Sequence, residues 1–206
     1  MSNASIAQVY EGSNADARLQ QLGFSREDII EAVRASEMAR SSHSSLAPTV
    51  AAGMKAWSDA FQTIAERKVP EGWVKTETKN LPRILNPDTA VAVAVATGDA
   101  ATGQSDEIPR SRHGRGAQSV FLVRCNERQY VLQFDDHHIP ARLPKEIEQS
   151  TWWLLIYSDG TQVRAELSLP VGVGDDRRLS VWRERIIVEV PDFTEIPFGG
   201  EGDEEP

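Results

Sequence analysis

Residues 90–96 read Ala-Val-Ala-Val-Ala-Val-Ala, and this strict alternation is the most restrictive feature of the sequence. In a β-strand, successive side chains point to opposite faces, so Val91, Val93 and Val95 would line one face and the alanines the other. A face of small alanine side chains suits a strand that a helix approaches closely. The alternation therefore predicts a strand with a helix packed against it.

The sequence before residue 73 is predicted to be helical. Ser25 is a suitable N-cap with Asp28 three residues later, and Phe24 and Ile29 stand at the two positions of a hydrophobic staple. A second helix is indicated by an apolar stripe with spacings of four, three, four and three: Val50, Met54, Trp57, Phe61 and Ile64. Such a stripe either packs on the chain's own sheet or binds a partner helix, and we favour the first.

After residue 73 the apolar pattern changes to a period of two. Asp159-Gly160 predicts a two-residue hairpin turn. Trp152 and Trp153 are adjacent, so in a strand they face opposite sides, and one of them would be in the core while the other marks a second layer or an interface. Strands are predicted at residues 90–96, 118–125, 129–135, 152–157, 162–169 and 181–190.

The predicted fold class is α+β, with N-terminal helices packed on a mainly antiparallel sheet or partly closed barrel, followed by a flexible acidic C-terminal tail. We expect one domain made of a helical cap region, residues 1–72, and an antiparallel β region, residues 73–191. Residues 192–206 would form the tail. A hydrophobic content of 40% is ordinary for a globular chain of 206 residues.

Composition also indicates the cellular compartment of the protein. Cys125 is the only cysteine, which excludes an intrachain disulfide and a cysteine-based zinc cluster. The chain has neither a signal-peptide pattern nor an apolar run of membrane-spanning length, so we expect a cytoplasmic protein without membrane contact. Arginine outnumbers lysine 17 to 5, a composition typical of GC-rich bacterial or phage genomes.

The last fifteen residues hold most of the negative charge. The formal net charge is −9, and this segment contributes six carboxylates and no lysine or arginine. Mutual repulsion would keep it extended, while Phe193, Ile196 and Phe198, together with Glu195, would contact a protein partner. The alternative is that the phenylalanines pack back onto the sheet and the rest only aids solubility.

Within this segment, Asp192 to Phe198 reads DFTEIPF and resembles the acidic tip of bacterial single-stranded-DNA-binding proteins, which ends in aspartates followed by Ile-Pro-Phe. Ile196, Pro197 and Phe198 match that tip, although here eight residues follow Phe198. The resemblance implies a tail that recruits partner proteins through an apolar pocket ringed by basic residues. It also implies competition between the tail and nucleic acid for a basic groove.

Residues 109–116 form the one concentrated basic element. Its Arg110, Arg112, His113 and Arg115 lie among glycine and serine, and a mobile loop of this kind suits phosphate contacts. Aromatic side chains would then stack on bases; the candidates are Trp73, Tyr130, Phe134, Trp152 and Trp153. The alternative is an inter-strand loop with no ligand. Residues 96–104, ATGDAATGQ, could likewise cradle an anion through backbone amides or form only a turn.

Four consecutive residues form the best candidate for metal binding or catalysis: Asp135, Asp136, His137 and His138. In an extended chain only Asp135 with His137, or Asp136 with His138, can share a site, because neighbours face opposite sides. A third ligand would come from Asp159, Glu166 or His113. A polar strand end with solvated histidines is the simpler interpretation.

The sequence lacks the motifs of phosphate loops, dinucleotide-binding turns and serine hydrolases, so we expect no cofactor and do not expect an enzyme. Our leading hypothesis is a non-enzymatic bacterial or phage accessory or adaptor protein that binds a protein partner, partly through its acidic-aromatic tail. One alternative is a single-stranded nucleic-acid-binding protein with an autoinhibitory tail. The other is a metal-dependent hydrolase that uses the Asp135–His138 cluster.

Overall fold

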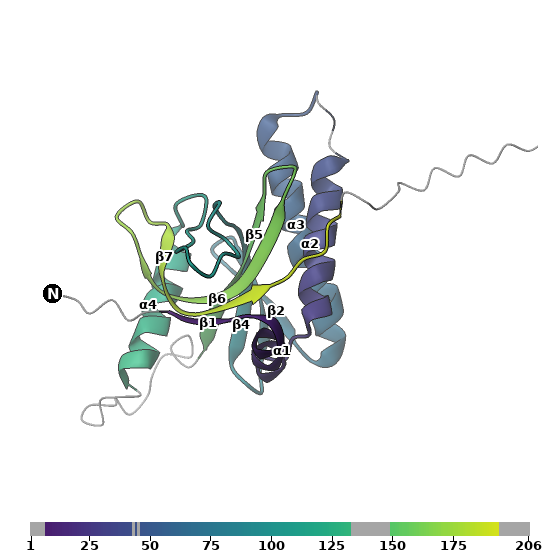
Figure 1. Cartoon of the computed structure of the whole chain (residues 1–206). Helices are drawn as coiled ribbons and strands as arrows, with labels where there is room; N and C mark the ends of the chain where they lie inside the picture. The colour runs from purple at the N-terminus through teal and green to yellow at the C-terminus, as the bar shows by residue number, and fades with distance from the viewer. Residues whose placement is uncertain (1–6, 43, 45, 133–148, 194–206) are drawn as a thin grey trace, which may run out of the picture.

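The computed structural model describes residues 7–42, 44, 46–132 and 149–193. It contains a seven-stranded mixed sheet with helices on both faces (Figure 1). The helices are α1 (Gly12–Gln21), α2 (Arg26–Ser41), α3 (Thr49–Lys68), followed by a short 3₁₀ turn at Val69–Glu71, and α4 (Ala117–Leu132). The strands are β1 (Gln8–Tyr10), β2 (Val74–Thr78), β3 (Leu81–Asn86), β4 (Val91–Thr97), β5 (Ser150–Ser158), β6 (Val163–Val173) and β7 (Leu179–Val188).

The strand order is β1-β7-β6-β5-β4-β3-β2. The pairs β1–β7 and β4–β5 are parallel, whereas the other four pairings are antiparallel. The mixed α+β class that the sequence indicates is therefore confirmed. Within the described ranges β1 and β2 form the two edges, so the sheet is open and the barrel alternative is not supported.

The first three helices cover one face of the sheet, as Figure 1 shows. A capping box starts α2, in which Ser25 Oγ accepts from the Asp28 amide at 3.1 Å and Asp28 Oδ2 accepts from the Ser25 amide at 2.8 Å. Phe24 and Ile29 both enter the core on this face, together with Val91, Val93 and Val95. The predicted start of α2 and the orientation of the valine face are thus confirmed.

The second face is covered by α4 and by residues 98–116, the segment that joins β4 to α4. Ala94 and Ala96 of β4 share a second buried cluster with Leu122 and Val123 of α4, so the alanine face does receive a helix. Trp152 lies in the first cluster and Trp153 in the second, and both are buried. The second tryptophan therefore marks a second layer rather than an exposed surface.

The prediction of strands at 118–125 and 129–135 was wrong, because residues 117–132 form α4. The buried positions on this helix, Ser119, Leu122, Val123, Cys125 and Asn126, follow a helical spacing, but Ser119 and Asn126 are polar and hide the apolar period. Asn126 is buried because it hydrogen-bonds the backbone: its amide group donates to the Thr151 and Pro170 carbonyls and accepts from the Thr151 amide, at 2.8–2.9 Å.

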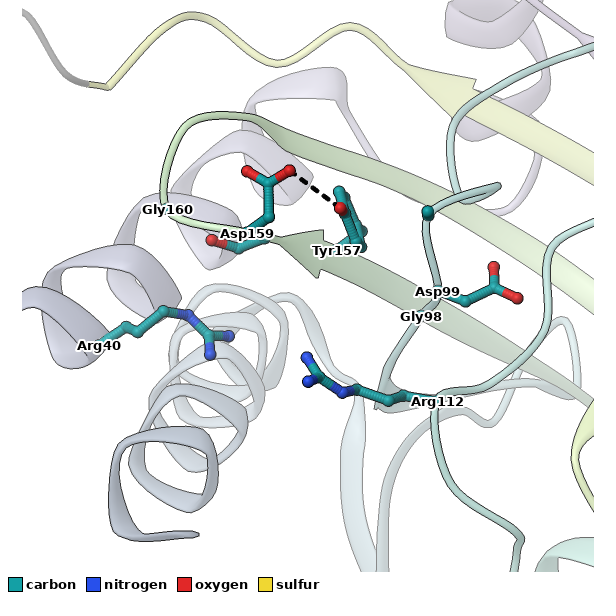
Figure 2. Close-up of a pocket in the computed structure, with 9 residues that line it drawn as sticks. Arg40, Gly98, Asp99, Arg112, Tyr157, Asp159 and Gly160 are labelled. Carbon is teal, nitrogen blue, oxygen red and sulfur yellow. Dashed lines mark hydrogen bonds between the residues drawn. The ribbon is translucent and has the colours of Figure 1, made fainter. Parts of the chain in front are cut away.

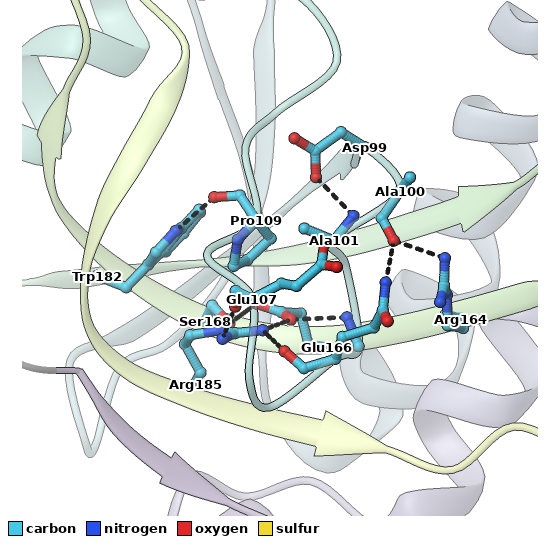
Figure 3. Close-up of polar contacts among 12 residues, drawn as sticks. Asp99, Ala100, Ala101, Glu107, Pro109, Arg164, Glu166, Ser168, Trp182 and Arg185 are labelled. Atoms are coloured by element: carbon cyan, nitrogen blue, oxygen red, sulfur yellow. Dashed lines mark hydrogen bonds and ion pairs between the residues drawn. The ribbon is translucent and has the colours of Figure 1, made fainter.

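A buried ion pair between Glu166 and Arg185 forms hydrogen bonds that connect residues 98–116 to the sheet (Figure 3). Arg185 of β7 donates to both carboxylate oxygens of Glu166 on β6, at 3.1 and 2.6 Å, and to the carbonyls of Glu107 and Gln104, at 2.7 and 2.8 Å. Glu166 also accepts from the Gly103 amide at 2.9 Å. Gly103 has a φ of +73°, and an added Cβ would lie 3.0 Å from that of Arg164, so glycine suits this position.

Replacing Arg185 by Met should destabilise the protein by about 3–5 kcal/mol, because Glu166 would then be buried without a counterion. The double variant Glu166→Gln, Arg185→Met should be less destabilised than the sum of the two single variants. Urea unfolding followed by tryptophan fluorescence measures all three. Additive losses would contradict a coupled pair.

A second buried network joins α2 to the end of α3. Asp28 lies within 2.7–2.8 Å of Arg67 and Lys68, and both Asp28 and Lys68 are buried. Burial alone would raise the pKa of Asp28, but hydrogen bonds from Lys68, Ser25 and Arg67 outweigh it and lower that pKa to about 2.

Because the folded pKa of Asp28 lies below its unfolded value, its contribution is fully present above about pH 4 and is lost as the pH falls toward 2. The difference corresponds to about 2 kcal/mol of unfolding free energy. Asp28→Asn should lower stability at pH 7 and flatten the acid limb of the stability–pH curve. Equal slopes between pH 4 and 2 in wild type and variant would contradict this assignment.

Candidate functional site

A pocket of ≈ 630 Å³ lies where the carboxyl ends of the parallel strands β4 and β5 meet. In open sheets, ligands bind preferentially outside the carboxyl ends of parallel strands. The pocket takes residues from the end of α2, from the segment after β4, and from the β5–β6 turn. They are Arg40, Gly98, Asp99, Ala100, Arg112, Tyr157, Ser158, Asp159 and Gly160.

Two arginine side chains enter this pocket from different elements and point toward one another (Figure 2). Arg40, on α2, donates through Nε to Glu37 at 3.3 Å. Glu37 also accepts from Ser158 Oγ at 2.8 Å, which ties the end of α2 to β5. Arg112 is exposed, and the described residues offer its side chain no ion pair or hydrogen bond. Among the described residues Arg112 is therefore without a partner, whereas Arg40 is paired with Glu37 through Nε and keeps its two terminal nitrogens free.

The two carboxylates of the pocket serve the local backbone and point away from the two guanidinium groups (Figure 2). Asp159 accepts from the Thr161 amide and hydroxyl, the Gln162 amide and the Tyr157 hydroxyl, at 2.8–3.0 Å. Led by the backbone amides, these hydrogen bonds hold the pKa of Asp159 well below its usual range. Asp99 accepts from the Ala101 amide at 3.2 Å.

The glycine-containing segment after β4 forms a tight turn. Its amides from Gly98 to Gln104 donate to acceptors inside the chain, Ala100 being the exception within the described residues. An anion cradle needs several free amides pointing to one place. The cradle hypothesis for residues 96–104 is therefore not supported, and the turn interpretation fits.

The basic segment 109–116 is hydrogen-bonded to the β6–β7 hairpin, unlike the mobile loop that we expected. Arg110 pairs with Asp176 at 2.6 Å, and Ser111 exchanges hydrogen bonds with the backbone of Leu179. His113 is exposed. Arg115 is half-buried, and burial lowers the pKa of its guanidinium to about 10. Of the four residues, only Arg112 lines the pocket.

The aromatic residues that we predicted would stack on bases are buried, where the structure describes their side chains. Trp73, Trp152 and Trp153 are 4%, 1% and 0% exposed. The Tyr130 side chain and Phe134 lie outside the described part of the chain. Stacking on these three tryptophans, part of the nucleic-acid alternative, is therefore contradicted.

The proposed metal ligands Asp135, Asp136, His137 and His138 also lie outside the described residues. Of the suggested third ligands, Asp159 is held in a turn and Glu166 is paired with Arg185. In the described ranges, no group of three or more histidine, cysteine or acidic residues could hold a metal ion. Cys125 is buried on α4.

Only the first of the predicted tail contacts is described. Phe193 packs against the core cluster on the α1–α3 face, with the Arg34 guanidinium 5.7 Å from its ring centroid. This packing matches the alternative in which Phe193 returns to the body of the protein. Glu195, Ile196 and Phe198 lie outside the described residues.

A second candidate surface, which we call the helical tip, lies where α2 and α3 are joined, at the top of Figure 1. Four large apolar side chains are exposed there: Met38 (58%), Leu46 (95%), Val50 (64%) and Met54 (62%). The predicted stripe on α3 is thus divided. Phe61 and Ile64 are buried on the sheet and Trp57 donates to the Val95 carbonyl at 3.0 Å, whereas Val50 and Met54 extend beyond it.

No protein-family model, curated protein or solved structure matches this chain. None of the helices in the described ranges combines the length and apolarity that a membrane span requires. The sequence marks Arg112 and the Asp159-Gly160 turn as notable but gives no sign of Arg40, because a cation near the end of an amphipathic helix is ordinary. Only the folded chain brings the three together.

Proposed function

We propose that the protein is a non-enzymatic accessory or adaptor protein that binds a protein partner through the helical tip. The observation that carries this proposal is the exposure of the four apolar side chains of the tip at the end of a helical pair. Several large apolar side chains exposed at one end of a folded chain are typical of a contact site, because leaving them in water forgoes the free energy of burial. Two of the four residues are methionines, whose flexible side chains adapt to a partner.

The surroundings of the tip favour an apolar groove as the partner surface. The nearby charges are already paired within the chain: Lys55 with Asp59 at 2.6 Å, and Arg34 with Glu31. They would not need a counterion from the partner. The last described residue, Phe193, lies beside Arg34 of α2, and acidic residues follow it in the sequence. A basic rim around the partner's groove would complement them.

A binding role is supported over a catalytic one by the state of the carboxylates. A general acid or base works best with a pKa near the working pH. Asp28 and Asp159 are shifted in the opposite direction, and Glu166 is neutralised by Arg185. A stoichiometric metal ion in the purified protein would instead favour the metal-dependent hydrolase.

The nucleic-acid alternative keeps one favourable observation, the exposed and unpaired Arg112. A single-stranded nucleic-acid-binding surface also needs a basic track and stacking faces. Arg110 is paired with Asp176 and Arg115 is half-buried, so the described residues do not form such a track. We therefore place protein binding first.

The double variant Val50→Gln, Met54→Gln should reduce partner affinity by about 10- to 100-fold, because two exposed anchors lose their apolar contacts. Its thermal stability should not fall, since both side chains are largely solvated in the free protein. A partner is first isolated on the immobilised full chain from the source cells and then purified. The affinity is measured by calorimetry with the two purified proteins.

Val181→Gln is the matched control, because Val181 is an apolar residue of β7 that is 43% exposed and distant from the tip. Equal affinity of the wild type and the double variant would refute the tip as the contact. So would a concentration-dependent dimer that the double variant abolishes, since a second copy would then cover the tip.

Deleting residues 194–206, with Phe193 retained for its core packing, separates the two binding hypotheses. The adaptor proposal expects weaker binding of the purified partner and unchanged weak binding of a single-stranded oligonucleotide. Salt-sensitive oligonucleotide binding that becomes tighter after deletion would instead identify the tail as an internal competitor for a basic site.

A further inference from the structure

We propose that the pocket at the ends of β4 and β5 binds a small phosphorylated molecule, with Arg40 and Arg112 pairing to its phosphate group. The proposal is independent of partner binding by the helical tip. It starts from the two guanidinium groups that enter the pocket from α2 and from the 98–116 segment and point toward one another (Figure 2). Two cations that converge on one space repel each other unless an anion lies between them.

The hydrogen-bond donors suited to an oxyanion are free. The described residues leave every side-chain N–H of Arg112 unused, and Arg40 uses only Nε, in a long contact with Glu37 of 3.3 Å. The terminal nitrogens of a guanidinium match the oxygens of a phosphate group in two parallel hydrogen bonds. The Ala100 amide, also at the pocket, has no acceptor among the described residues and is a further donor.

The acidic residues of the pocket do not neutralise this pair. Neither Asp99 nor Asp159 forms an ion pair with Arg40 or Arg112, and both carboxylates point away from them (Figure 2). The Asp159 oxygens are occupied by the turn and by Tyr157. Asp99 uses one oxygen for the Ala101 amide, which leaves the other to accept a hydrogen bond from a ligand hydroxyl.

The size of the pocket indicates more than a bare anion. A volume of ≈ 630 Å³ lies within the range of small-molecule sites, about 300–1,000 Å³. The Tyr157 ring and the backbone of Gly98 and Gly160 line the remaining wall. A phosphomonoester that carries a sugar or nucleoside therefore fits the chemistry. A nucleic-acid strand fits less well, because Arg110 and Arg115 do not extend the positive surface.

The test is a titration of the ¹⁵N-labelled full chain with four probes: ribose 5-phosphate, adenosine 5′-monophosphate, inorganic phosphate and adenosine. Binding is monitored by amide chemical shifts at constant ionic strength. We expect saturable shifts at Gly98–Ala100 and Tyr157–Gly160 with at least one of the two esters. Binding of both esters would indicate that the pocket recognises a sugar phosphate. Binding of the nucleotide alone would indicate that it also recognises the base. Adenosine without phosphate should cause no such shifts.

Arg112→Gln and Arg40→Gln should each weaken the binding of that ester by about tenfold or more, as expected for the loss of a charge-assisted hydrogen bond. Arg124→Gln is the matched control, because Arg124 is an exposed arginine on α4 that does not line the pocket. Amide signals away from the substituted residue that keep their wild-type chemical shifts will show that each variant is folded.

Three results would overturn the proposal. One is the absence of saturable shifts with either ester up to about 10 mM, which corresponds to negligible affinity. Another is an unchanged affinity in Arg112→Gln. The last is binding of inorganic phosphate as tight as that of the esters, which would mean that the pocket recognises no body beyond the anion.

Discussion

The ion pair between Glu166 and Arg185 determines how the second face of the sheet is built. Burying two charges is costly unless each is paired and its remaining hydrogen-bonding capacity is used. Here the arginine also binds two carbonyls of residues 98–116, and the glutamate binds an amide of the same segment. A stretch without helix or strand is thus attached to the sheet through buried hydrogen bonds. The same segment supplies Asp99, Ala100 and Arg112 to the pocket, so the position of one pocket wall depends on this pair.

The two candidate surfaces meet at the end of α2. Glu37 accepts hydrogen bonds from both Ser158 of β5 and Arg40. The next residue, Met38, belongs to the exposed helical tip. Where α2 and α3 lie over the sheet, their apolar faces are buried, and where they extend past it, the same stripe is exposed. The sheet is therefore shorter than the helices that cover it, and the difference creates the tip. A ligand in the pocket and a protein on the tip would lie on opposite sides of a single helical turn.

Local chemistry was sufficient to predict the parts of the fold that depend on neighbours in the sequence: the Ser25 cap and the valine and alanine faces of β4. A turn does lie at Asp159-Gly160, but residues 159–162 connect β5 to β6, so the predicted two-residue connection was too short. The prediction failed where burial was satisfied at long range. Asn126 is buried because it hydrogen-bonds residues of β5 and β6, and a buried polar residue interrupts the apolar pattern that would indicate a helix. For this reason α4 was not predicted, and neither was the parallel crossover from β4 to β5 that contains it. The β2–β3 turn uses Lys79 and Asn80 with positive φ instead of glycine, and gave no turn signal. Arg40 could not be predicted because its role depends on tertiary position alone.

The pairing of β1 with β7 has a consequence for how the chain reaches its native state. In the described part of the chain the first strand lies parallel to the last, with Gln8 opposite Glu184 and Tyr10 opposite Ile186. Helices α1 to α3 can begin to form from local contacts during synthesis, but this pairing can form only after β7 has been synthesised. Until then the backbone groups that β1 and β7 share have no partner in each other. Completion of the sheet is therefore a late, length-dependent event, in which a small strand of three residues joins the two ends of the fold.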